Sequence, residues 1–73
     1  MNETLRLVTV ESGGGEGNLL GTLTFDGETI TSDTRIATDT ADMLRRRSRK
    51  PDPALWAYLK DNGWSNGQVM LTE

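Results

Sequence analysis

The chain has 73 residues, of which 34% are hydrophobic, and its formal net charge is −3. It contains no cysteine and no histidine, which excludes disulfides, Cys/His zinc sites and catalysis by a cysteine nucleophile or a histidine base. A chain of this length forms a single domain, residues 1–73. Small domains without disulfides or metals often gain stability from a partner, so composition favours a protein partner or self-assembly.

The first predicted element is a strand over residues 3–10, with Leu5 and Leu7 on one face and Arg6 and Val8 on the other. The acidic N-terminal stretch lacks the basic and apolar regions of a signal peptide. No run of about 18 apolar residues predicts a membrane helix. We therefore expect a protein of the cell interior, or one packaged inside an assembly, without contact with a membrane.

A glycine-rich segment follows at residues 11–18 and predicts a flexible connection. Glycine-rich loops that bind phosphate lead into the N-terminus of a helix, often through a G-K-[ST] sequence. This segment lacks that sequence and leads into a predicted strand, so we expect no phosphate site here.

A β-hairpin is predicted next. Its first strand, residues 19–25, would place four residues on one face: Leu19, Gly21, Leu23 and Phe25. Asp26-Gly27 predicts a two-residue type I′ turn, which leads into a third strand over residues 28–31.

Two helices are predicted in the middle of the chain. The first spans about 35–48, entered through Ser32-Asp33-Thr34, with Asp39 as an alternative cap. Its residues at helical spacing are Ile36, Thr40, Met43, Leu44 and Arg47.

The second helix is predicted from a proline pattern. Pro51 ends the first helix, Asp52 caps the second, and Pro53 takes its first position. Gly63 is the expected left-handed residue after the end of this helix. The inward stripe is Leu55, Tyr58 and Leu59, which leaves Trp56 at the flank.

The chain closes with a turn at residues 65–67 and a short strand over residues 68–72, where Val69 and Leu71 share a face. The element order is β-β-β-α-α-β. It predicts an α+β fold with a three- or four-stranded sheet and both helices packed on one face.

Five cations occupy six positions at the end of the first helix: Arg45, Arg46, Arg47, Arg49 and Lys50. Two interpretations stay open. The cations form a solvated helix C-terminus that matches the helix dipole, or they contact nucleic-acid phosphates or an acidic partner. Their helical positions spread over about 200°, which is wide for a single binding stripe.

The tryptophans are the main candidates for binding a partner. A half-exposed Trp56 beside Trp64 and the turn residue Asn66 is typical of an interaction hot spot. The alternative is that both tryptophans complete a small core. Trp64 is expected to pack back on the last helical turn, near Tyr58 or Leu59.

No constellation predicts catalysis. The serines have no histidine to activate them, and Asp39 with Asp42 gives too few ligands for a cation site. We therefore predict no enzyme activity, no catalytic residue, no metal, no cofactor and no small-molecule substrate.

The segment Gly63-Trp64-Ser65-Asn66-Gly67, followed by Gln68-Val69-Met70-Leu71, resembles small accessory proteins from the virion-structure gene block of actinobacterial tailed phages. These proteins combine an N-terminal hairpin, here Leu23 to Gly27, with a helical middle and a G-W-S-N-G-like end. The triple arginine and the long glycine-rich segment depart from that pattern. The resemblance implies a small accessory protein of a phage particle and carries over no catalytic residue.

The expected function is that of a non-enzymatic structural or interaction protein, a minor capsid or head-associated component of a bacteriophage virion. One alternative is a small nucleic-acid-associated regulator that uses the basic run. Another is a phage-encoded inhibitor of a host protein.

Overall fold

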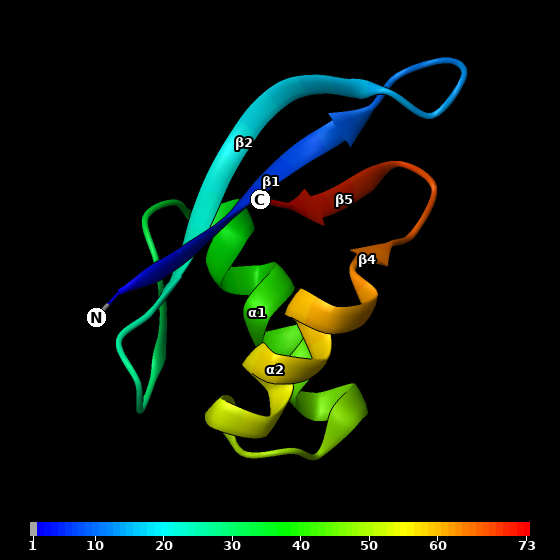
Figure 1. The fold of residues 1–73 in the computed structure, drawn as a ribbon. Coiled ribbons are helices and arrows are strands. Elements are labelled where there is room, and N and C mark those ends of the chain that lie inside the picture. The colour runs from blue at the N-terminus through cyan, green and yellow to red at the C-terminus, as the bar shows by residue number, and fades with distance from the viewer. Residues whose placement is uncertain (1) are drawn as a thin grey trace.

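The computed structural model describes residues 2–73; Met1, the first residue of the acidic N-terminal stretch, lies outside the described residues. The described chain forms a five-stranded antiparallel sheet with two helices against one face (Figure 1). The predicted α+β class and helix placement are confirmed, but this sheet has five strands rather than three or four. The additional strand is β4, Trp64–Ser65.

The strand at the centre of the sheet is β1, Glu3–Val10, and the strand order is β3-β2-β1-β5-β4. On one side β1 pairs with β2, Glu16–Phe25, and on the other with β5, Val69–Thr72. Leu5 and Leu7 share a face, as predicted, and this face is buried in the core cluster with residues of both helices.

Strand β2 contains bulges that change which face its residues occupy. Leu7 pairs with Gly21, but the next residue, Val8, pairs with Leu19, so Leu20 has no partner on β1. A bulge of this kind breaks the alternation of faces. Leu19, expected on the inner face, is 61% exposed, and Leu20 packs against the core instead.

The hairpin between β2 and β3, Ile30–Ser32, forms as predicted, but its loop is longer. Phe25 pairs with Ile30, so four residues connect the strands rather than two. The Asp26 carboxylate accepts hydrogen bonds from the backbone N–H groups of Glu28 (2.8 Å) and Thr29 (2.9 Å). These bonds stabilise the longer loop in place of the type I′ turn.

Helix α1, Arg35–Ser48, has the predicted bounds. Thr34 is its N-cap, so the alternative cap at Asp39 is wrong. The Thr34 hydroxyl accepts a hydrogen bond from the Ala37 N–H (3.2 Å) and donates one to the Leu20 carbonyl (3.0 Å). This side chain therefore starts the helix and ties it to β2.

The buried face of α1 differs from the predicted one. Ala37, Ala41 and Leu44 are buried, whereas Ile36 is 49% exposed. The physical reason is Gly21: a Cβ atom there would lie 3.0 Å from the Ala37 Cβ. The helix approaches the sheet so closely that only small side chains fit between them.

Helix α2, Asp52–Asn62, follows after three residues. Its N-cap position is Pro51, and Asp52 makes no capping hydrogen bond, so the predicted Asp52 cap is wrong. Gly63 ends the helix with φ 68°, as expected, and its N–H bonds to the Leu59 carbonyl at 2.9 Å.

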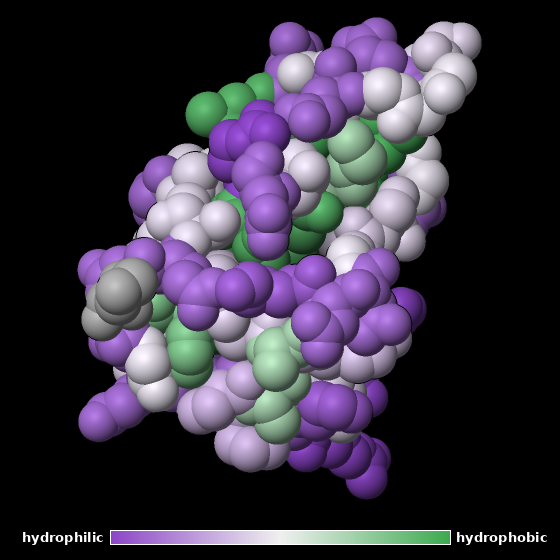
Figure 2. Space-filling model, viewed as in Figure 1, coloured by the Kyte–Doolittle hydropathy of each residue, from purple (hydrophilic) through white to green (hydrophobic). Residues whose placement is uncertain are grey.

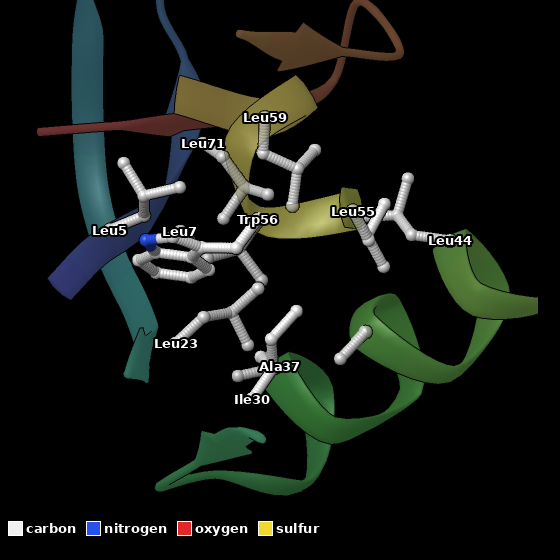
Figure 3. Packing of buried hydrophobic residues seen from close by; sticks show 11 residues of the cluster. Leu5, Leu7, Leu23, Ile30, Ala37, Leu44, Leu55, Trp56, Leu59 and Leu71 are labelled. Atoms are coloured by element: carbon white, nitrogen blue, oxygen red, sulfur yellow. The ribbon is translucent and has the colours of Figure 1, made fainter. Parts of the chain in front are cut away.

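The core is one cluster between the sheet and the helices (Figure 3). Five strand residues and six helix residues contribute to it: Leu5, Leu7, Leu23, Ile30 and Leu71, with Ala37, Ala41, Leu44, Leu55, Trp56 and Leu59. Polar and charged residues cover most of the face seen in Figure 2, and hydrophobic residues appear there only in small patches.

Candidate functional site

Trp56, predicted to be half-exposed, lies in the core. It is 2% exposed, and its indole ring stacks on Phe25 with ring centroids 5.5 Å apart. Figure 3 shows the ring among the strand leucines Leu5, Leu7 and Leu23. Such a side chain offers no surface to a partner, so the expectation of an exposed hot spot at Trp56 is wrong.

Trp64 and Asn66 lie at the short β4–β5 hairpin. Trp64 is half-buried against the core, on the same face as Leu71, with which it pairs. The Asn66 side-chain oxygen accepts hydrogen bonds from the N–H groups of Gln68 and Val69, both at 2.9 Å. Asn66 stays exposed but its side chain builds the turn, and Trp64 is the tryptophan of the predicted site that keeps an accessible surface.

The basic run is divided in two by the fold, because Arg45 turns inward. Its guanidinium binds the Asp52 carboxylate through two hydrogen bonds, Nε to Oδ1 at 2.9 Å and Nη2 to Oδ2 at 3.1 Å. Nη2 also donates to the Ile30 carbonyl at 2.7 Å, and Nη1 donates to Asp42 at 2.8 Å. Arg45 is therefore a structural residue and is not free for a partner.

This ion pair also closes an edge of the sheet. Ile30 lies on β3, an outer strand, and its N–H donates to Asp52 Oδ2 at 2.9 Å while its carbonyl accepts from Arg45. The two side chains thus bind the backbone groups that a further strand would bind. The hydrogen bond from Arg45 holds the pKa of Asp52 below its ordinary value. We call this arrangement the Arg45–Asp52 clip.

The other four cations of the run are exposed: Arg46, Arg47, Arg49 and Lys50. No ion pair to a carboxylate involves them within residues 2–73. Arg49 ends α1 in the left-handed conformation, with φ 55°. The Lys50 ammonium lies 5.4 Å from the centre of the Tyr58 ring, a cation–π contact.

A groove of about 260 Å³ lies where α1 ends and α2 passes β4. Its lining is of three kinds: a buried floor of Leu44, Leu55 and Leu59, walls of Tyr58 and Trp64, and a polar rim of Arg47, Ser48 and Lys50. We call it the helix-end groove. Tyr58, predicted to face inward, is 48% exposed and forms its outer wall.

The helix-end groove joins two features that the sequence suggested separately. Trp64 comes from the predicted aromatic site, and Arg47 and Lys50 come from the basic run. Sequence reasoning missed Tyr58 as a surface residue. The apolar floor, aromatic walls and cationic rim suit a binding surface.

A second cavity, of about 270 Å³, lies at the start of β1 beside α2. Glu3 and Lys60 line it and form an ion pair, which lowers the pKa of Glu3. Trp56 also lines this cavity, and its indole Nε1 is buried without a hydrogen-bond partner among the described residues. Its opposite charges satisfy each other, so the helix-end groove is the stronger candidate.

The remaining candidates give no site. The glycine-rich segment, predicted as a connection over residues 11–18, is a tight turn over residues 11–15, in which the Glu11 N–H bonds to the Gly15 carbonyl at 2.7 Å. Residues 16–18 belong to β2, so the predicted strand start at residue 19 is wrong. Within residues 2–73, no three Asp or Glu side chains gather as metal ligands. Neither helix of the described chain has the length and apolar character to cross a membrane.

Comparison of the chain with family models, curated proteins and solved structures gives no match. The helix-end groove and the segment of residues 63–71 are therefore the two features from which a function can be proposed.

Proposed function

We propose that this chain is a non-enzymatic interaction protein that binds another protein through the helix-end groove. The observation that carries the proposal is a groove with an apolar floor, walled by a half-exposed tyrosine and a half-buried tryptophan. Aromatic residues around a desolvated pocket are enriched at binding hot spots. A small domain with no disulfide would also be stabilised by a partner that binds only the folded state.

The proposed setting is a bacteriophage particle, in which the chain is a minor capsid or head-associated protein. The resemblance at Gly63-Trp64-Ser65-Asn66-Gly67 supports this setting. Two residues of that segment, Gly63 and Gly67, have positive φ angles and shape the β4 hairpin that carries Trp64 to the groove. The segment thus has a direct structural relation to the proposed binding surface.

The test is to purify particles of a phage that encodes this chain and measure its abundance by mass spectrometry. The wild-type chain should be present, and Tyr58→Ala should lower its abundance at least fivefold, since it removes one groove wall. Ile36→Ala is the matched control, because Ile36 is equally exposed but lies outside the groove lining. Absence of the wild-type chain from particles would overturn the virion setting.

A second candidate is binding to nucleic acid, favoured by the exposed cations at the end of α1, which form no ion pair with any carboxylate of residues 2–73. Such binding would weaken steeply with salt. The outcome that favours it is an affinity for DNA that falls when Arg46 or Arg47 is replaced but is unchanged by Tyr58→Ala.

A further inference from the structure

We propose that the helix-end groove binds an acidic segment of a partner protein, in which carboxylates flank an apolar side chain that enters the groove. This inference rests on the proposed function and names the chemistry of the partner.

The groove is small enough to be filled by one side chain. Pockets for drug-sized ligands hold roughly 300–1,000 Å³, and this groove holds about 260 Å³. Its floor consists of Leu44, Leu55 and Leu59. A polar group pressed onto these leucines would lose its hydrogen bonds to water without replacement, so the anchoring side chain is apolar.

The cations of the groove rim favour negatively charged residues on either side of the anchoring side chain. Arg47 and Lys50 line the groove, and the exposed Arg46 and Arg49 stand beside them in the chain. The cation–π contact with Tyr58 holds the Lys50 ammonium at the groove mouth. Carboxylates on either side of the anchor would meet Arg47 and Lys50, the two cations of the groove lining, as the apolar side chain enters.

The charge of the rest of the chain also favours an acidic partner segment. The net charge is −3, and the four exposed cations of the run contribute +4, so the remaining residues, with Arg45 paired in the clip, carry −7. An acidic segment is repelled by most of the molecule and attracted to this one end. Such a field steers approach and orientation. The same distribution disfavours a long polyanion such as DNA, which would extend beyond the cationic end.

The probe for the test is a display library of random short peptides, selected on the immobilised full chain. Selected peptides should carry an excess of Asp and Glu around Phe, Leu, Ile or Trp. For the strongest peptide, replacing the acids by Asn, or the apolar anchor by Ala, should each weaken binding about tenfold. Selection of peptides without an acidic excess would overturn the inference.

Two pairs of variants locate the binding on the molecule. Arg47→Ala should weaken the selected peptide at least threefold, and its neighbour Arg46→Ala, outside the groove lining, by less than twofold. Tyr58→Ala should weaken it at least fivefold, while Ile36→Ala leaves it unchanged. Far-ultraviolet circular dichroism confirms that each variant is folded. Equal effects within both pairs would place binding elsewhere and overturn the inference.

A labelled oligodeoxythymidine separates the two classes of partner. Binding of this strand tighter than the selected peptide, at the same salt concentration, would overturn the inference in favour of nucleic acid. The inference that the partner is acidic can fail while the proposed role as an interaction protein holds, and the two outcomes are distinguishable. If Tyr58→Ala depletes the chain from particles but the selected peptides are neutral, the interaction role stands and the acidic partner is wrong.

Discussion

Gly21 is the point of closest approach between α1 and the sheet. An added Cβ would press on the Thr34 hydroxyl and lie 3.0 Å from the Ala37 Cβ. Thr34 cannot yield easily, because its hydroxyl caps α1 and binds the Leu20 carbonyl. The absence of a side chain at Gly21 therefore allows α1 to lie close to β2, and this close approach requires a small residue such as Ala37 on the facing side of the helix.

Gly21→Ala should lower the free energy of unfolding by about 2 kcal/mol, as overpacking does. Gly15→Ala is the matched control: nothing lies within 4 Å of an added Cβ there, so the change should stay within about 0.5 kcal/mol. Urea unfolding followed by circular dichroism measures both. Equal stability of the two variants would contradict the close approach.

At the scale of elements, the Arg45–Asp52 clip joins three of them. Arg45 lies near the end of α1, Asp52 at the start of α2, and Ile30 on β3. The bidentate pair holds the short β3 strand in place, and it occupies the backbone groups that would otherwise invite another chain.

The clip makes stability depend on acid. Arg45 holds the pKa of Asp52 in the folded state below the ordinary value of about 3.9. The ion pair therefore contributes fully to the free energy of unfolding above about pH 3.9, and this contribution is lost as the pH falls below that value. Asp52→Asn should cost about 2 kcal/mol at pH 7. The unfolding free energies of wild type and variant should then converge toward about pH 2. Urea unfolding at several pH values measures this, and parallel curves would contradict it.

The boundaries of the helices followed from local chemistry, but their buried faces and the bounds of β2 and β3 did not. Thr34 and Gly63 mark helix ends through bonds within a few residues, so α1 and the end of α2 were predictable. In α2, two stripes of equal width include Leu55 and Leu59, one with Tyr58 and the other with Trp56. Periodicity cannot choose between them; packing against Phe25 selects Trp56.

The candidate site was predictable only in part, for a similar reason. Arg45 and Arg47 are the same residue type two positions apart, and only the tertiary contacts with Asp52 and Ile30 assign the first to structure. The bulge at Leu20 likewise depends on pairing with β1, which no local pattern records. Trp64 followed from its place after Gly63.

The whole molecule is organised around β1, which pairs with a strand near in sequence and with one distant in sequence. The face of β1 that carries Leu5 and Leu7 packs in the core cluster, to which the other strands and both helices also contribute. A domain built this way has no part that folds without the central strand, so we expect it to unfold in one cooperative step.

Leu7→Ala should lower the free energy of unfolding by about 3 kcal/mol, because Leu7 is only 1% exposed. Leu19→Ala, on the neighbouring strand and 61% exposed, should change it by less than about 0.5 kcal/mol. Thermal unfolding by circular dichroism checks both. A separate transition for the helices in either variant would contradict the single core.

The placement of the two tryptophans gives the molecule two spectroscopic probes. Trp56 is sealed against Phe25, and its emission reports whether the core is intact. Trp64 stands at the wall of the helix-end groove, half in water. A molecule that settles in the groove would exclude water from the second indole and leave the first untouched. Occupancy and unfolding are thus separable by the colour of the protein's own fluorescence, without any attached label.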